Sequence, residues 1–173
     1  MKTAICPGSF DPVTLGHVDV IERAAHIFDR TVVVVLQNRS KECNFTAEER
    51  VTMLRKVTDY LPNVTVEHSD RLLADTCAEL GDDVVVVKGL RAVSDFEHEF
   101  QMALMNRKLN RTLDTLFLTA SERFQYVSSS VIKEICSYGG DVSELLPPEI
   151  HDEVVHRLAG RGNSLSTPAR KTL

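Results

Sequence analysis

Two runs of consecutive aliphatic residues constrain the fold of this chain most strongly. They occupy residues 32–36 and 84–87, and every position in both is valine or leucine. A strand that is apolar on both faces is expected in a parallel sheet with helices covering each side. Both runs are far shorter than the ~20 residues that a helix needs to cross a bilayer. We therefore predict a buried parallel sheet and no membrane-spanning segment.

The rest of the sequence alternates between strand-like and helix-like segments. Short runs rich in β-branched residues predict strands at residues 3–6, 31–37, 64–67, 84–88 and 115–119. Apolar residues at helical spacing predict helices at residues 17–28, 46–60, 72–80, 94–110, 128–138 and 148–158. This order predicts right-handed βαβ units, and hence an α/β fold consisting of one doubly wound, Rossmann-like domain with a five-stranded parallel sheet flanked by helices. Capping boxes are expected at Thr46/Glu49 and at Ser94/Glu97.

The length and charge of the chain limit its domain organisation and its partners. The 173 residues suit one domain at residues 1–159, followed by a tail at residues 160–173 whose composition predicts disorder. That tail has three basic residues and no acidic ones, so the net charge of −5 leaves −8 on the rest of the chain. An acidic body argues against broad nucleic-acid binding. It is compatible with a small anionic ligand in a locally basic cleft.

The cysteines and the N-terminus indicate a cytoplasmic protein. The four cysteines are scattered without a CxxC pair, and the first residues lack the apolar stretch of a signal peptide. We expect reduced thiols.

Residues suited to binding phosphate follow the predicted strands. The first strand leads through Pro7-Gly8-Ser9-Phe10 to Thr14-Leu15-Gly16-His17, where a helix N-terminus and a histidine can meet a phosphate. Lys41, Lys88 and Arg91 follow the second and fourth strands, and Ser128-Ser129-Ser130 opens a helix after the fifth. Each residue alone is also typical of a solvated surface or a helix cap. Together, at one edge of a parallel sheet, they favour a polyphosphate ligand.

Several kinds of catalytic site are absent from the sequence. There is no Gly-x-Ser-x-Gly elbow, no P-loop and no His/Cys/Asp cluster at metal-ligand spacing. The chemistry is therefore expected to rest on positioning and charge stabilisation around phosphates, without a covalent intermediate.

The same residues resemble a known family. Thr14-Leu15-Gly16-His17 is similar to the HxGH motif of the nucleotidyltransferase superfamily, and Ser128-Ser129-Ser130-Val131-Ile132-Lys133 is similar to its second motif. The stretches at residues 7–17, 45–50, 88–91, 95–99, 127–130 and 139–147 together resemble the bacterial phosphopantetheine adenylyltransferases over residues 7–158. This resemblance implies transfer of AMP from ATP to 4′-phosphopantetheine, giving dephospho-CoA and pyrophosphate with Mg²⁺, in a homohexamer.

The resemblance also implies roles for individual residues. His17, Lys41 and Arg91 would be catalytic, with His17 stabilising the transition state. Ser9, Lys41, Leu73 and Lys88 would bind the pantetheine substrate. The expected ATP-binding residues are Ser9, Phe10, His17, Gly89, Leu90, Arg91, Glu99, Phe124, Gln125, Tyr126, Val127, Ser128, Ser129 and Ser130. No protein ligand is expected for the metal. Three features differ from the common family pattern: Lys88 stands in place of arginine, His98 stands in place of tyrosine, and Phe124-Gln125-Tyr126 varies the adenine loop.

Three alternatives remain at the level of sequence. Another member of the superfamily, such as a cytidylyltransferase or a nicotinamide mononucleotide adenylyltransferase, would share the histidine motif. A nucleotide-sensing module without turnover would be expected to lack His17 or the basic residues, which are present. A fragment of a class I tRNA synthetase disagrees with the chain length and with the acidic body.

Overall fold

The fold is a five-stranded parallel sheet with helices on both faces, as a computed structural model shows for residues 1–37, 42–81 and 83–162. The strand order β3-β2-β1-β4-β5 confirms the predicted doubly wound fold. The strands are β1 (Thr3–Gly8), β2 (Arg30–Leu36), β3 (Val64–Ser69), β4 (Val84–Leu90) and β5 (Asp114–Thr119). The helices are α1 (Leu15–Ile27), α2 (Ala47–Thr58), α3 (Leu73–Leu80), α4 (Val93–Leu109), α5 (Ser129–Ser137) and α6 (His151–Gly162), with 3₁₀ turns η1 (Glu122–Phe124) and η2 (Pro148–Ile150).

The central strands bury side chains on both faces, which explains their unbroken apolar sequence. In β2, Val33 and Val35 join a large core cluster with α1, α2, α5 and α6. Val32 and Val34 point to the opposite face and pack in a smaller cluster with Cys77 of α3. All four valines are fully buried. The alternation follows from the two-residue period of a strand.

One of the two predicted capping boxes is present. The Thr46 hydroxyl accepts a hydrogen bond from the Glu49 N–H at 3.2 Å, and the Glu49 carboxylate accepts one from the Thr46 N–H at 2.8 Å. The box predicted at Ser94/Glu97 was wrong. There α4 begins at Val93 with Ala92 as its N-cap, and no side chain caps it.

The end of the domain also differs from the prediction. Helix α6 continues to Gly162, so residues 160–162, assigned to the tail from composition, extend a helix. Residues 163–173 lie outside the described residues.

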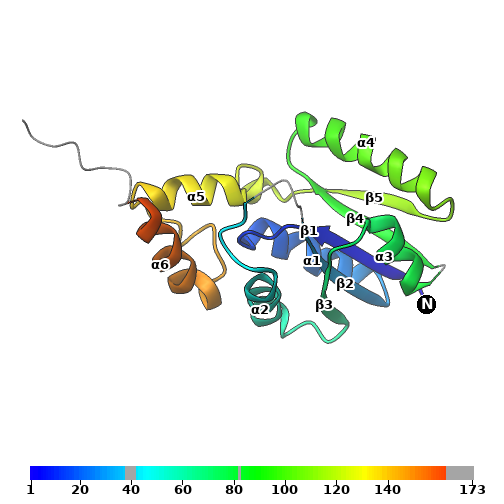
Figure 1. Cartoon of the computed structure of the whole chain (residues 1–173), viewed down its shortest axis with the longest axis horizontal. Helices are drawn as coiled ribbons and strands as arrows, with labels where there is room; N and C mark the ends of the chain where they lie inside the picture. The colour runs from blue at the N-terminus through cyan, green and yellow to red at the C-terminus, as the bar shows by residue number, and fades with distance from the viewer. Residues whose placement is uncertain (38–41, 82, 163–173) are drawn as a thin grey trace, which may run out of the picture.

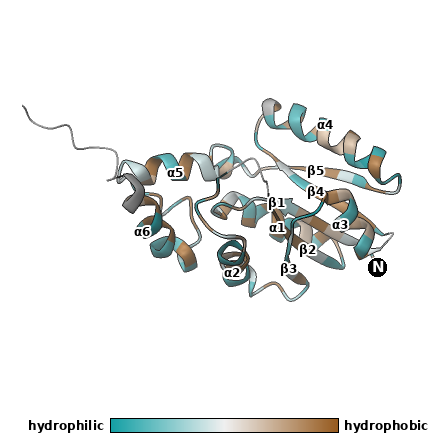
Figure 2. Ribbon diagram, in the orientation of Figure 1, coloured by the Kyte–Doolittle hydropathy of each residue, from teal (hydrophilic) through white to brown (hydrophobic). Residues whose placement is uncertain are grey.

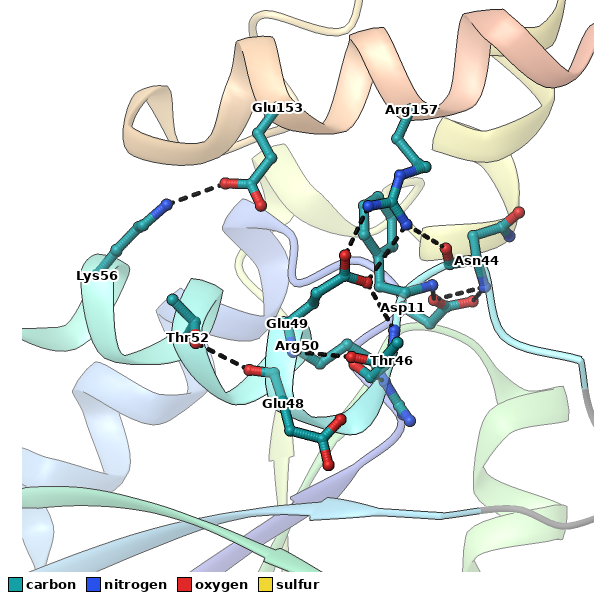
Figure 3. Close-up of polar contacts among 11 residues, drawn as sticks. Asp11, Asn44, Thr46, Glu48, Glu49, Arg50, Thr52, Lys56, Glu153 and Arg157 are labelled. Carbon is teal, nitrogen blue, oxygen red and sulfur yellow. Dashed lines mark hydrogen bonds and ion pairs between the residues drawn. The ribbon is translucent and has the colours of Figure 1, made fainter.

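Polar contacts join α6, α2 and the segment after β1 (Figure 3). Arg157 on α6 forms an ion pair with Glu49 at 2.6 Å and donates to the Asn44 carbonyl at 3.1 Å. The buried Asp11 carboxylate accepts from the Asn44 and Phe45 N–H groups, both at 3.0 Å. It also pairs with Lys133 of α5 at 3.1 Å. The segment after β1 is therefore held by the residues that lead into α2 and by α5.

The order in which successive strands are added to the sheet reverses between β1 and β4. From β1 it moves outward through β2 and β3, and β4 then returns to the other side of β1. A doubly wound sheet binds its ligands at such a switch point, beyond the carboxyl ends of the strands. Among residues 1–37, 42–81 and 83–162, none of the helices combines the length and apolar character needed to cross a membrane.

Candidate active site

A cavity of about 560 Å³ opens at this switch point. Its walls come from the segments that follow β1, β4 and β5 and from α1 and α4. The predicted site residues that line it are Ser9, Phe10, His17, Lys88, Gly89, Arg91, Glu99, Phe124, Val127, Ser128, Ser129 and Ser130. The fold thus brings together residues separated by more than a hundred positions in the chain.

Other predicted residues lie away from the cavity wall. Leu90 ends β4 and is half-buried, whereas Gln125 and Tyr126 are exposed on the loop after η1. Leu73 begins α3 and packs against the smaller core cluster. Lys41, predicted to be catalytic, lies outside the described residues.

His17 is fixed to the first turn of its own helix. The Thr14 hydroxyl accepts from the His17 N–H at 3.2 Å, and the His17 ring nitrogen Nδ1 accepts from the Thr14 N–H at 3.0 Å. This is a capping box in which histidine takes the usual place of glutamate. Because Nδ1 accepts, the proton of the neutral ring must sit on Nε2. The Phe10 ring lies edge-on to the imidazole at a centroid distance of 5.1 Å.

The surroundings of His17 keep its ring neutral. Burial, followed by the positive charges of Arg91 and Lys88, lowers the pKa of His17 from 6.5 to about 4. We expected His17 to offset growing negative charge, and with the ring neutral it does so as an Nε2–H donor and not as a cation.

The N-termini of α1 and α5, both at the cavity, differ in the backbone N–H groups that remain available to an anion. Helix α1 begins at Leu15, two residues earlier than predicted, and the Leu15 and His17 N–H groups bond to Leu145 and Thr14. At α5 the Ser128 hydroxyl caps the Val131 N–H at 3.1 Å, and the Ser129 hydroxyl donates to the Pro12 carbonyl at 2.7 Å. Within the described part of the chain, the first-turn N–H groups of Ser129 and Ser130 remain for an anion.

Lys88 and Arg91, the basic side chains among the described residues that line the cavity, both have acidic partners. Lys88 on β4 pairs with Glu99 on α4 at 3.2 Å. Arg91 pairs with Asp95 through Nε at 2.9 Å and Nη2 at 3.2 Å, and its Nη1 donates to the Val127 carbonyl at 3.0 Å. A phosphate entering the cavity therefore meets cations that are already oriented.

Asp95 is a lining residue that our sequence reasoning missed. The sequence contains no clear signal for this pair, because Arg91 lies before the start of α4 and the helical spacing of opposite charges does not apply to it.

Two glycines allow the backbone to pass close to neighbouring side chains here. A Cβ on Gly8 would lie 2.9 Å from the Phe10 ring, and a Cβ on Gly89 would lie 2.6 Å from Cγ2 of Val20 on α1. Any larger residue at position 89 would require the Val20 side chain to shift.

The described residues contain no group of three or more His, Cys, Asp or Glu side chains able to hold a metal ion. The acidic side chains at the cavity, Asp95 and Glu99, are each paired with a cation.

Comparison with known proteins shows to which family the chain belongs. A family model described as cytidylyltransferase-like matches residues 5–135. The phosphopantetheine adenylyltransferase of Caldanaerobacter subterraneus subsp. tengcongensis is 46% identical over 157 residues, which cover 91% of this chain and 98% of that protein. The chain belongs to the phosphopantetheine adenylyltransferase family.

A solved structure supports the fold of this adenylyltransferase family member. The crystal structure described as that of a nicotinate-nucleotide adenylyltransferase from Vibrio parahaemolyticus superposes with a TM-score of 0.62 at 19% identity. The match covers 96% of this chain and 98% of the other. At this identity the likeness concerns the fold alone.

Proposed function

We propose that this chain transfers AMP from ATP to 4′-phosphopantetheine, forming dephospho-CoA and pyrophosphate. The observation that carries the proposal is that His17, Lys88 and Arg91 line one cavity at the carboxyl ends of β1 and β4. Two anionic reactants repel each other, so a site that joins them must gather positive charge and hydrogen-bond donors. The family membership supports the identity of both substrates.

The proposed reaction is a direct displacement. A phosphate oxygen of 4′-phosphopantetheine attacks the α-phosphorus of ATP in line, and the bond from that phosphorus to the pyrophosphate oxygen breaks. The nucleophile is already an anion, so no strong base is needed. Burial raises the pKa of the Cys6 thiol, which lines the cavity, to about 12. This thiol stays protonated near neutral pH and is a poor nucleophile, which supports a mechanism without a covalent intermediate.

The chain supplies charge stabilisation at three places in this scheme. The neutral His17 donates its Nε2–H to an α-phosphoryl oxygen as negative charge builds there. Arg91, held by Asp95 and Val127, and the first-turn N–H groups of α5 bind the remaining ATP phosphates. From its place in the family motif, we also assign to Lys41 contacts with the phosphate of 4′-phosphopantetheine and with the α-phosphate of ATP.

Lys88 and Glu99 have paired roles in the proposed complex. Lys88 binds the phosphate of 4′-phosphopantetheine, while Glu99 accepts from the ribose hydroxyls of ATP. In the structure these side chains bind each other at 3.2 Å, so substrates replace one ion pair with two separate contacts. Ser9, which is exposed at the cavity mouth, lies where both substrates would pass. Leu73 remains a proposed contact for the pantetheine arm.

We propose that Mg²⁺ enters together with ATP. Among the described residues, the two carboxylates that line the cavity, Asp95 and Glu99, are both paired with cations, which fits a metal held mainly by substrate phosphates and water. When bound, the ion supplies neutralisation of triphosphate charge.

We further propose that copies of this chain assemble, with the homohexamer of the family as the expected state. Apolar side chains of α4 are left exposed, among them Phe100, Leu104, Met105 and Leu109 at 44–56% exposure. Figure 2 shows apolar residues along this helix at the edge of the fold. Exposed apolar area of this kind marks a contact surface. Light scattering on the purified protein tests the assembly, and a mass of 19.3 kDa would refute it.

We infer a cytoplasmic location for this activity. Cys6, Cys77 and Cys136 are buried thiols without disulfide partners, which suits a reducing compartment.

A substrate screen tests the proposed function. Purified protein is incubated with ATP, Mg²⁺ and one acceptor, and pyrophosphate release and the product mass are measured. We expect dephospho-CoA with 4′-phosphopantetheine and much slower turnover with nicotinamide mononucleotide. Replacement of ATP by CTP separates adenylyl from cytidylyl transfer. Turnover only with another acceptor, or only with CTP, would overturn the proposal in favour of another member of the superfamily. No turnover with any pair would favour a nucleotide-sensing module.

A further inference from the structure

We propose that Asp19 and Ser121 form a positioning pair that fixes the nucleotide-binding loop, residues 120–128, to the helix that carries His17. This inference rests on the proposed function, because the loop is taken to contact the adenine nucleotide. Asp19 lies two positions after His17 on α1, and Ser121 lies just after β5. Neither residue lines the cavity, so both would act through their neighbours.

The contact between the two residues is short, and one partner is buried. The Ser121 hydroxyl donates to the Asp19 carboxylate at 2.6 Å, and Asp19 is 8% exposed. Arg23, one turn further along α1, donates to the Thr119 carbonyl at 2.6 Å and lies 3.5 Å from the same carboxylate. A hydrogen bond to a charged group in a poorly solvated place is among the stronger polar contacts in proteins. Helix α1 therefore binds the chain on both sides of Ala120.

The position of Ser121 shows that its hydroxyl is used for this contact. Ser121 is the N-cap of the short helix η1, where a serine side chain usually accepts from a backbone N–H of the first turn. No side chain caps η1, and the Ser121 hydroxyl points to Asp19 instead. The local hydrogen bond is replaced by one that spans 102 positions in the chain.

Backbone hydrogen bonds within the loop connect Ser121 to residues that line the cavity. The Phe124 N–H donates to the Ser121 carbonyl at 2.8 Å, and the Val127 N–H donates to the Phe124 carbonyl at 3.0 Å. The Val127 carbonyl then accepts from Arg91 at 3.0 Å. Phe124 and Val127 are both buried and both line the cavity.

The first turn of α1 also passes close to this loop. A Cβ on Gly16 would lie 3.5 Å from the Phe124 Cβ, which is ordinary contact distance. Helix α1 thus holds the catalytic donor His17 and the loop expected to hold adenine, as one unit. Loss of the Asp19–Ser121 contact would loosen the ATP side of the cavity and leave Lys88, on β4, in place.

The substitution S121A tests the pair with steady-state kinetics. We expect the KM for ATP to rise roughly tenfold, the size of effect from losing one hydrogen bond to a charged group. The KM for 4′-phosphopantetheine and kcat should change little. S121T, which keeps a hydroxyl, should restore most of the ATP affinity. S137A is the matched control, since it removes an exposed serine hydroxyl bond of 2.7 Å on α5 away from the cavity.

A double variant tests whether Asp19 and Ser121 act through the same contact. In D19N with S121A, the rise in the KM for ATP should be no larger than in D19N alone, because the bond that S121A removes is one of several Asp19 contacts that D19N weakens, together with those to the Ser121 N–H and to Arg23. An active enzyme in which S121A leaves the KM for ATP at the S137A value would overturn the positioning role alone. Equal rises in both KM values would also overturn it, since they would indicate general loosening. A wild-type protein without turnover would overturn the proposed function, and this inference with it.

Discussion

Acid should destabilise this protein through His17, and the substitution H17Q isolates that effect. The neutral ring accepts from the Thr14 N–H and faces Lys88 and Arg91, so a proton on it is disfavoured in the folded state. The unfolded chain has no such restriction. Because the folded-state pKa is depressed, the stabilising contribution is present above the unfolded value of 6.5 and is lost as the pH falls towards about 4.

The expected loss follows from the two pKa values. With 6.5 in the unfolded chain and about 4 in the folded protein, acidification from about pH 7.5 to about pH 5 removes about 2 kcal/mol of unfolding free energy. Since His17 lies at the wall of an open cavity, solvent screens the charges of Lys88 and Arg91, and this value is an upper bound.

Urea unfolding of wild type and H17Q at both pH values measures the effect. Glutamine suits the capping box, so H17Q keeps the acceptor for the Thr14 N–H and removes the titrating group. The wild-type protein should lose more stability on acidification than H17Q, by up to about 2 kcal/mol. Equal losses in the two proteins would refute a depressed pKa for His17. A larger loss in H17Q would reverse the sign of the reasoning.

Three further substitutions test the cavity. H17A should lower kcat at least roughly 100-fold with smaller changes in substrate affinity, as for loss of one preorganised donor, and a loss confined to KM would make His17 a ground-state binder. K88A should raise the KM for 4′-phosphopantetheine at least roughly tenfold, and an unchanged KM would remove Lys88 from the site. G89A should lower stability by about 1–3 kcal/mol in thermal unfolding, because its Cβ would lie 2.6 Å from Val20. The double variant G89A/V20A should regain part of the lost stability, and no recovery would show that the loss does not come from contact with Val20.

The sheet and most of its helices were predictable because their signals are local. Valine runs in β2 and β4 indicated strands buried on both faces, and the Thr46/Glu49 spacing located the start of α2. The same kind of signal failed at Ser94. There α4 begins at Val93, and the Asp95 carboxylate accepts from the Arg91 N–H and side chain. Because Val93 is already helical, Ser94 lies inside the helix and not at its N-cap, and sequence spacing alone does not show at which residue a helix begins.

The positions of the candidate site residues were also predicted only in part. Residues that directly follow β1 and β4, such as Ser9 and Arg91, reach the cavity as expected, because parallel strands end at one edge of the sheet. Gln125 and Tyr126 do not, since η1 turns them to solvent while Phe124 and Val127 face inward. The direction of a side chain on an irregular loop depends on contacts such as Ser121 with Asp19, which no sequence period encodes.

By itself, the sequence determined the order of strands and helices along the chain, the edge of the sheet where the candidate phosphate-binding groups meet, and the family. These depend on side-chain periodicity and on motifs of a few consecutive residues. Only the tertiary structure decided that His17 is a neutral donor, that Lys88 and Arg91 are held by Glu99 and Asp95, and that α1 anchors the loop at Ser121. Charge state and orientation depend on burial and on partners across space, and the folded chain sets both.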